Sequence, residues 1–148
     1  MTSDTSPSCP SGVRYRLDDQ VGFILRLVAQ RHHAIFAGGI GADLTPTQWA
    51  ALAKLAEAGP LSQNLLGRQT AMDAATIKGV VDRLARRNLV SIRQERPGGR
   101  RLTVALTDEG QALHADTVTR ALRITEATLA PLDDAERESV MRLLARLR

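Results

Sequence analysis

Residues 62–106 carry the succession of signals that most restricts what this chain can fold into. Ser62 and Asp73 are favourable N-cap residues, and each precedes a short stretch with helical character, over about 63–69 and 74–88. Two short helices separated by a tight break are typical of a helix-turn-helix. The second helix has an inward-facing stripe at helical spacing, formed by Ile77, Val80, Val81 and Leu84.

A β-hairpin is predicted directly after these two helices. Its turn is Pro97-Gly98-Gly99, and apolar residues alternate with period two on both sides of the turn. A hairpin in this position is the wing of a winged helix-turn-helix. The predicted fold class is therefore mainly α with a two-stranded β wing. The alternating residues are Val90 and Ile92 before the turn, and Leu102, Val104 and Leu106 after it.

The helices outside this unit are more apolar than one buried face requires. A helix that is apolar on more than one face must be buried on more than one side. In a small protein, a second copy of the chain can bury the additional apolar face. We therefore expect dimerisation helices in 17–43 and 108–148, on either side of the winged helix-turn-helix lobe over 44–107, with a flexible tail over 1–16. The apolar positions of the first helix, about 17–36, are Leu17, Val21, Phe23, Ile24, Leu25, Leu27, Val28 and Ile35.

Two capping boxes mark the starts of further helices. Thr45 and Gln48 form the first box, and Pro46 occupies the first helical position, where its missing N–H is harmless. Asp133 and Glu136 form the second box and open the last helix. The predicted order is thus four helices, two strands and two helices.

The charge of the chain is concentrated in its centre. Residues 61–101 hold nine Lys/Arg and three Asp/Glu, whereas residues 1–60 hold five of each and residues 102–148 hold six and eight. A basic block of this kind is the electrostatic footprint of a polyanion such as double-stranded DNA. The alternative interpretation is a solvated basic face without a partner.

Several classes of protein lack support in the sequence. The sequence has no run of 18 apolar residues, so no transmembrane helix is predicted. Its N-terminus lacks the features of a secretory signal. Aromatic residues make up 3% of the chain, too few for a platform that stacks single-stranded nucleic acid. The sequence contains no phosphate-binding loop, no metalloprotease motif and no nucleophile elbow, so nothing in it predicts an enzyme. We therefore expect a cytoplasmic protein that is not an enzyme and has no cofactor.

The residues of the central unit resemble a known family. Residues 73–90 look like the recognition helix of the MarR (multiple antibiotic resistance regulator) family, and residues 44–49 and 106–110 also match its pattern. The resemblance covers about residues 17–148, including the order of elements. It implies a homodimer whose first, fifth and sixth helices form the interface. It also implies binding to pseudo-palindromic duplex DNA, with transcription repressed until a small ligand binds.

The chain departs from the family pattern in two places. Lys78 and Gly79 stand where members often carry a hydroxyl residue and Arg, so the base preferences of other members do not carry over. The wing of the family usually contains an Asp-x-Arg sequence whose Asp orients the Arg. This chain has Gly98-Gly99-Arg100-Arg101 instead.

The candidate DNA contacts fall into three groups. A hydroxyl and a Lys near the start of a recognition helix can reach base edges or phosphates in the major groove, and wing arginines can enter a narrow minor groove. Arg86 and Arg87 are either phosphate contacts or exposed charges. The alternative for all groups is a solvated surface. The groups are Thr76, Lys78 and Arg83 with the helix cap Asp73; Ser62 and Arg68 as phosphate contacts; and Arg96, Arg100 and Arg101 in the wing.

A ligand site is predicted at the end of the first helix and on the second. A cationic or hydrogen-bonding group beside an aromatic wall suits a small aromatic carboxylate or its thioester. Residues 17–23 and 30–33 are also similar to the subgroup that controls catabolism of aromatic and N-heteroaromatic acids. Alternatively, one histidine caps the helix end and the other is exposed. The candidate ligand residues are Arg31, His32, His33 and Trp49.

Thiol and metal chemistry are not favoured. Cys9 is the single cysteine, which excludes an internal disulfide and a Cys-rich zinc site. It lies in the tail, without a fixed basic neighbour to lower its pKa, so we do not expect a thiol sensor. His32, His33 and His114 lack the spacing of zinc ligands.

Two other functions remain open at this point. One is a helical dimer that binds an acidic protein through the basic patch, which predicts no sequence-dependent DNA binding. The other is a sequence-tolerant architectural DNA-binding protein. Salt-dependent titrations with matched and scrambled duplexes separate both from a specific regulator.

Overall fold

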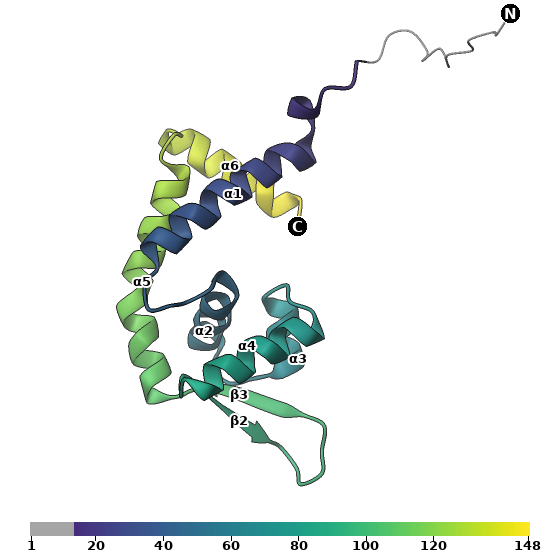
Figure 1. Cartoon of the computed structure of the whole chain (residues 1–148), viewed down its shortest axis with the longest axis vertical. Helices are drawn as coiled ribbons and strands as arrows, with labels where there is room; N and C mark the ends of the chain where they lie inside the picture. The colour runs from purple at the N-terminus through teal and green to yellow at the C-terminus, as the bar shows by residue number, and fades with distance from the viewer. Residues whose placement is uncertain (1–13) are drawn as a thin grey trace, which may run out of the picture.

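The long helix α5 connects two parts of the molecule (Figure 1). A computed structural model describes residues 14–148. One part contains α2, α3, α4 and the sheet, and the other contains α1 and α6. The elements are η1 Leu17–Asp19, α1 Val21–Gly39, α2 Pro46–Ala58, β1 Leu61–Ser62, α3 Gln63–Gln69, α4 Ala74–Arg86, β2 Val90–Gln94, β3 Leu102–Leu106, α5 Asp108–Leu129 and α6 Asp134–Arg146.

Side-chain caps start most of the helices, as the sequence predicts. The Thr45 hydroxyl accepts a hydrogen bond from the backbone N–H of Gln48, and the Gln48 side chain accepts one from the N–H of Thr45. Asp133 and Glu136 form the same reciprocal pair before α6. Both predicted capping boxes are confirmed. Each box provides acceptors for backbone N–H groups that have no partner inside the helix.

The boundaries of the first helix differ from the prediction. Residues 17–19 form a separate 3₁₀ turn, and the backbone is extended at Gln20 before α1 begins. At its other end, α1 continues to Gly39 instead of stopping near Phe36. A Cβ at Gly39 would lie 3.0 Å from the Ile124 side chain. Glycine therefore lets α1 approach α5 closely, and this tertiary contact outweighs the low helix propensity of glycine.

The wing consists of the two predicted strands and a third, very short one. Strands β2 and β3 are antiparallel, with Val90 opposite Leu106, and β1 pairs with the other edge of β3. The prediction missed β1 because its two residues, the second of which is the N-cap of α3, are too few to show an alternating pattern. The third strand attaches the start of α3 to the wing.

The buried core lies mostly in the part with α2, α3, α4 and the sheet. The predicted stripe of α4 is buried, and each of its four side chains is at most 1% exposed. The α2 residues Leu52 and Leu55 and the β3 residue Val104 pack in the same cluster. Burial of this one face of α4 leaves its opposite face free for a partner.

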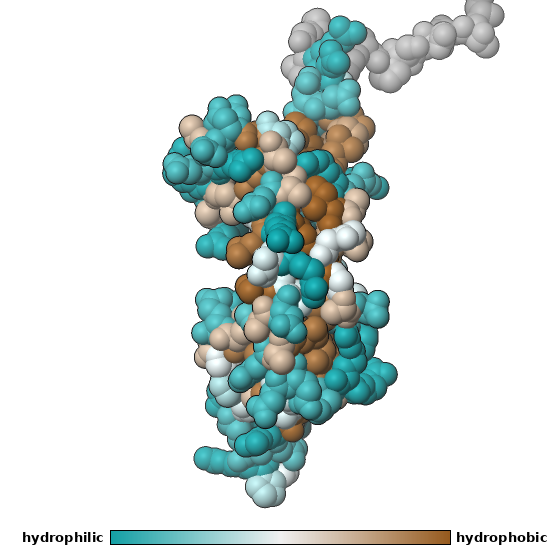
Figure 2. Space-filling model, turned by 90° about the vertical axis from the view of Figure 1, so that its left-hand side faces the viewer, coloured by the Kyte–Doolittle hydropathy of each residue, from teal (hydrophilic) through white to brown (hydrophobic). Residues whose placement is uncertain are grey.

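The other part of the molecule exposes apolar side chains. Single chains rarely leave a large contiguous apolar surface in water, so this face is a candidate interface. Figure 2 shows hydrophobic residues on the surface of this part. Among residues 14–148, no helix is long and apolar enough to cross a membrane. The exposed apolar residues are Val21, Ile24, Leu25, Leu27 and Val28 on α1, and Met141, Leu143 and Leu144 on α6, with Leu147 after it.

Candidate nucleic-acid interface

Helices α3 and α4 form a tight two-helix unit. Gly67 is buried in α3, and a Cβ there would lie 3.0 Å from Ile77 of α4 and 3.1 Å from the carbonyl oxygen of Met72. The N–H of Met72 donates to the carbonyl of Gly67, which closes the break between the helices. The geometry of a helix-turn-helix thus depends on a small residue in α3, which the sequence pattern did not single out.

The outward face of α4 carries the predicted major-groove residues. Thr76, Lys78 and Arg83 are all exposed, away from the buried stripe. The Lys78 ammonium pairs with the Asp82 carboxylate at 2.7 Å, one helical turn further on. The Arg83 guanidinium lies over Gly79, at 3.5 Å from where a Cβ would be. The absence of a side chain at Gly79 therefore leaves room for Arg83 along the helix surface.

Asp73 caps α4 through its carboxylate. Its Oδ1 accepts a 2.7 Å hydrogen bond from the backbone N–H of Thr76. This backbone bond, with a smaller contribution from the Thr76 side chain, lowers the pKa of the Asp73 carboxyl. Hydrogen bonding to the charged form of a carboxyl has this effect because it stabilises that form.

The lowered pKa of Asp73 predicts a loss of stability in acid. The cap contributes fully above the ordinary aspartate pKa of about 3.9, and its contribution disappears as the pH falls through the lower pKa of the folded state. Asp73→Asn retains an N-cap acceptor but does not titrate. We expect the difference in melting temperature between this variant and the wild type to change over the acid range. A constant difference from pH 7 to pH 3 would contradict this prediction.

The wing and the start of α3 enclose a small basic cavity of about 220 Å³. The pairing of Ser62 in β1 with Thr103 in β3 brings these two segments together. The cavity brings together four predicted contact residues from distant parts of the sequence: Ser62, Arg68, Arg100 and Arg101. Two further polar residues also line it, Gln63 and Asn64, which the sequence pattern did not indicate. The lining residues are Ser62, Gln63, Asn64 and Arg68 from the first segment, and Arg100, Arg101 and Leu102 from the wing.

Glu95 supplies the carboxylate of the wing. Its Oε2 lies 3.7 Å from Nε of Arg101, and its Oε1 accepts a 3.0 Å hydrogen bond from the Thr103 hydroxyl. The carboxylate thus faces Arg101 from the other arm of the hairpin, in a wing that lacks the Asp-x-Arg sequence usual in the family. Arg96 lines a second groove at the tip of the wing, together with Arg100 and Arg101.

The structure gives Arg86 and Arg87 local partners. Arg87 donates to the backbone carbonyls of Ala42, at 2.8 Å, and Asp43, at 3.3 Å. The Nε of Arg86 donates to the carbonyl of Asp82 in the preceding turn. Ala42 and Asp43 have positive φ angles, a conformation that non-glycine residues adopt at a cost. Arg87 therefore stabilises the loop between α1 and α2.

Removing the negative charge of Asp82 should strengthen DNA binding. Asp82→Asn frees the Lys78 ammonium and takes a carboxylate from the outward face of α4. We expect affinity for an arbitrary duplex to rise by about tenfold at low salt. The slope of log K against log salt should steepen by about 0.9 for each additional phosphate that the protein neutralises. Fluorescence anisotropy with a labelled duplex measures both quantities.

A matched pair on α2 provides the control for Asp82→Asn. Glu57 accepts from Lys54 at 2.8 Å, an ion pair of the same type on a different helix. Glu57→Gln changes the net charge by the same amount, so its effect measures the contribution of net charge alone. Equal effects of the two substitutions would refute a contact role for the outward face of α4.

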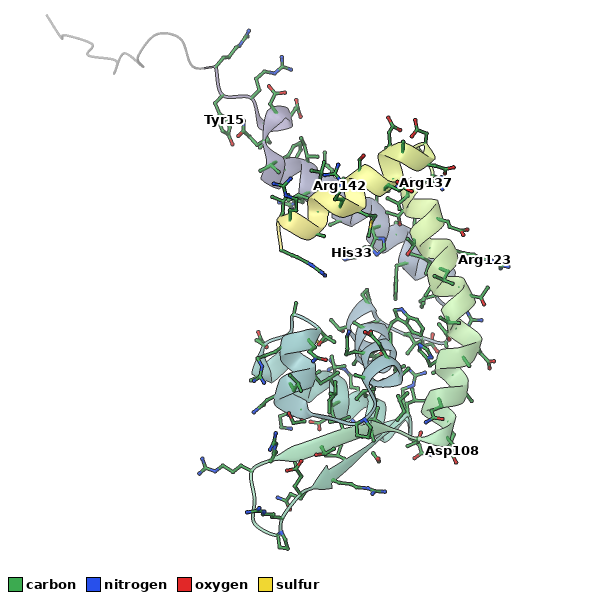
Figure 3. The ribbon with its side chains drawn as sticks, turned by 180° about the vertical axis from the view of Figure 1, so that it is seen from behind. Tyr15, His33, Asp108, Arg123, Arg137 and Arg142 are labelled. Carbon is green, nitrogen blue, oxygen red and sulfur yellow. The ribbon has the colours of Figure 1, made fainter. Side chains whose placement is uncertain are left out.

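The predicted ligand residues divide into two groups. Arg31 donates to the backbone carbonyls of Ala127 and Thr128 near the end of α5, and His32 Nδ1 lies 2.9 Å from the Thr128 hydroxyl. The exposed His33 is adjacent to His32 on α1 (Figure 3).

Trp49, on α2, packs against a different part of α5. Its ring stacks on His114, with 5.2 Å between ring centroids and an interplanar angle of 11°. His114 is fourteen residues before Thr128 in the same helix, about 21 Å along the axis at 1.5 Å per residue. Within one chain, the structure therefore brings Arg31, His32 and His33 together and places Trp49 apart from them. Cys9 lies outside the described residues.

Comparisons with known proteins agree with this geometry. The model of the MarR family matches residues 42–101. The transcriptional repressor NicR of Pseudomonas putida is 36% identical over 99% of this chain and 95% of its own length. A probable transcriptional regulator from Pseudomonas aeruginosa has a TM-score of 0.86 and 55% identity, over 90% of this chain and 100% of that one. Bordetella bronchiseptica BpsR, whose DNA binding is regulated by 6-hydroxynicotinic acid, has a TM-score of 0.84 and 36% identity, over 91% and 98%.

Proposed function

The chain belongs to the MarR family of transcriptional regulators, and from this membership we propose that it is a homodimeric repressor released from its operator by a small aromatic acid or its thioester. The observation that carries this proposal is the basic surface formed by α3, α4 and the wing. We also propose that the protein acts in the cytoplasm, where it would meet its operator DNA.

The recognition surface has the two components that a specific DNA-binding protein needs. The outward face of α4 supplies Thr76, Lys78 and Arg83 toward the major groove, where base edges are read. The cavity between α3 and the wing supplies Arg68 and Arg100, among others, toward the phosphate backbone. In this arrangement the phosphate contacts fix the register of the protein on the duplex, and α4 provides the sequence preference.

The exposed apolar faces of α1 and α6 support a dimer. We propose that residues 17–43 and 108–148 form the dimerisation part and 44–107 the DNA-binding lobe. A symmetric dimer places two copies of α4 in successive major grooves about 34 Å apart, which matches a pseudo-palindromic operator.

The proposed effector follows from two relatives. NicR is a repressor, and the DNA binding of BpsR responds to 6-hydroxynicotinic acid. Arg31, His32, His33 and Trp49 are the proposed ligand residues. Because Arg31 and His32 hold α1 against the end of α5, a carboxylate that bound them would compete with these contacts. Such competition gives the ligand a differential affinity for the two states, which any shift of population requires.

Duplex titration tests the proposal directly. The probe is the DNA flanking this protein's own gene, with scrambled duplex as competitor and with salt varied. We expect tight, sequence-selective binding that weakens when 6-hydroxynicotinate or benzoate is added. Linkage then requires the ligand to bind more weakly, by the same factor, when the operator is present.

The same titration identifies the competing functions. Equal and salt-sensitive binding to both duplexes would indicate an architectural DNA-binding protein. Absence of binding to either duplex would favour a protein partner for the basic surface. Equal ligand affinity with and without the operator would refute release by the ligand.

A further inference from the structure

Within residues 14–148, two connections join the part with α1 and α6 to the part with α2, α3, α4 and the sheet. One is the unbroken helix α5, and the other is the loop between α1 and α2 (Figure 1). Ile40 and Leu44 anchor the two ends of this loop in the core, where they are 3% and 6% exposed. A hinge is a few loop residues that absorb changes in φ and ψ. Residues 41–43, between the two anchors, are therefore the hinge of this connection.

These three residues form a left-handed turn. Their φ angles are all positive, at +68° for Gly41, +54° for Ala42 and +49° for Asp43. Glycine adopts this conformation freely, whereas alanine and aspartate adopt it less readily. The N–H of Leu44 donates to the carbonyl of Gly41 at 3.3 Å and closes the turn. Strain of this kind persists only where the surrounding structure holds it in place.

Arg87, at the end of α4, supplies such a contact. Its Nη2 donates to the carbonyl of Ala42 at 2.8 Å, and its Nη1 donates to the carbonyl of Asp43 at 3.3 Å. One planar guanidinium thus binds the carbonyls of two successive residues. The contact goes to the backbone, and within residues 14–148 no ion pair joins Arg87 to a carboxylate. It therefore depends on the conformation of the turn and not on a side-chain charge.

The end of α4 that carries Arg87 is itself held firmly. The N–H of Leu89 donates to the carbonyl of the fully buried Leu84 at 3.0 Å. The carbonyl of Asn88 accepts a 2.6 Å hydrogen bond from the Thr107 hydroxyl, and the positive φ of Asn88 turns the chain away from the helix. Arg87 therefore connects the hinge to a fixed point on the helix that carries the predicted major-groove residues.

A third element meets the same turn. The Arg120 guanidinium on α5 lies 3.6 Å from where a Cβ of Gly41 would be. The turn thus brings α1, α4 and α5 together, because α1 leads into it, Arg87 binds its carbonyls and α5 packs against its first residue. The orientation of α4 relative to the dimerisation part depends on this junction.

The hydrogen bonds of Arg87 distinguish it from its neighbour Arg86. Both Nη atoms of Arg87 are engaged with the turn. Within residues 14–148, Arg86 donates only through its Nε, to the carbonyl of Asp82 in the preceding turn of the same helix. The two adjacent arginines therefore differ in the one property that matters here, a contact with the hinge.

We propose that Arg87 is a positioning residue for DNA binding. It fastens the left-handed turn at 41–43 to the end of α4, and so sets the distance between the two copies of α4 in the dimer, without touching DNA itself. The proposal rests on the proposed function, because it takes the dimer and its two half-sites from there.

Two substitutions of Arg87 separate positioning from phosphate contact. Arg87→Gln removes the charge, whereas Arg87→Lys keeps the charge and replaces the planar fork by a single ammonium. A phosphate contact would survive in the lysine variant, but the fork on two carbonyls would not. We expect both variants to bind the DNA flanking this protein's own gene about tenfold or more weakly, measured by fluorescence anisotropy at constant salt. Wild-type affinity in Arg87→Lys would overturn the proposal.

Tolerance of half-site spacing separates positioning from a general loss of stability. The probe is the same duplex with two base pairs inserted at the centre of the segment that footprinting identifies, which moves the half-sites about 7 Å further apart. We expect the insertion to weaken binding by the wild type about a hundredfold and binding by Arg87→Gln about tenfold or less, because a loosened hinge lets the helices adapt. An equal loss in both proteins would overturn the proposal.

Hydrogen exchange tests the contact in the free protein. We expect the amides of residues 40–45 to exchange about tenfold faster in Arg87→Gln than in the wild type, because the turn opens more often. Arg86→Gln is the matched control, since it removes the same charge from the neighbouring position, and it should leave this exchange unchanged. Unchanged exchange in Arg87→Gln, or equal acceleration in Arg86→Gln, would overturn the proposal.

The failure of the proposed function has a different signature. Absence of duplex binding by the wild type would refute that function and the role of Arg87 in it together. Selective duplex binding by the wild type, with any of the contrary results given for Arg87, would overturn the positioning role alone.

Discussion

Gly110→Ala is expected to destabilise the protein by about 3 kcal/mol or more, because a Cβ at this position has no space. It would overlap the carbonyl oxygen of Leu89 and lie 3.0 Å from the carbonyl carbon. That carbonyl also accepts a hydrogen bond from the N–H of Thr107, so the backbone around Leu89 is held in place. The first turn of α5 packs here against the start of the wing. A chain of this length should lose roughly 10 °C in melting temperature.

Gly79→Ala is the matched control for this prediction. Gly79 is also helical, but a Cβ there would lie 3.5 Å or more from its nearest neighbour, Arg83, which is an ordinary contact. Alanine restricts the unfolded chain and favours the helix, so Gly79→Ala should stabilise the protein by about 0.5–1 kcal/mol. Urea titrations of both variants measure the two free energies of unfolding. A loss below about 1 kcal/mol for Gly110→Ala would mean that α5 moves freely relative to the wing.

Replacing Arg68, Arg100 and Arg101 together by alanine is expected to reduce duplex affinity by at least about a hundredfold at low salt. All three side chains line the cavity between α3 and the wing. The slope of log K against log salt should become shallower by about 0.9 for each phosphate that the protein no longer neutralises, counted over both chains of a dimer. Selectivity between duplexes should change less than affinity, because phosphate contacts carry no direct sequence information.

Arg123→Ala is the control for the triple replacement. It removes a guanidinium from the outer side of α5, away from the DNA-binding lobe. Its slope should equal that of the wild type. An unchanged slope in the triple variant would exclude phosphate contacts by these arginines and leave DNA binding to the outward face of α4.

The sequence predicted the helix starts because capping is local. Thr45 and Asp133 lie three residues from their partners Gln48 and Glu136, so each pair is recognisable without knowledge of the fold. The buried stripe of α4 was predicted for the same reason, since helical periodicity is a local property. The helix-turn-helix and the two long strands of the wing follow from signals of this kind.

Other features depend on contacts between distant residues. The strand β1 exists only because β3 offers it an edge, and no pattern within two residues indicates this pairing. Arg31 was predicted to face a ligand, but its hydrogen bonds to the end of α5 emerge only when the two helices meet.

The continuity of α5 has a mechanical consequence. This helix has 22 residues, and it joins the part with the exposed apolar faces to the part with α2, α3, α4 and the sheet without a break. At 1.5 Å per residue it is about 33 Å long, so a tilt of roughly 5° at one end displaces the other by about 3 Å. In a dimer the two displacements act together on the distance between the recognition helices. In the proposed mechanism, a lever arm of this length would convert a small rearrangement near Arg31 into a mismatch between the recognition helices and two fixed grooves.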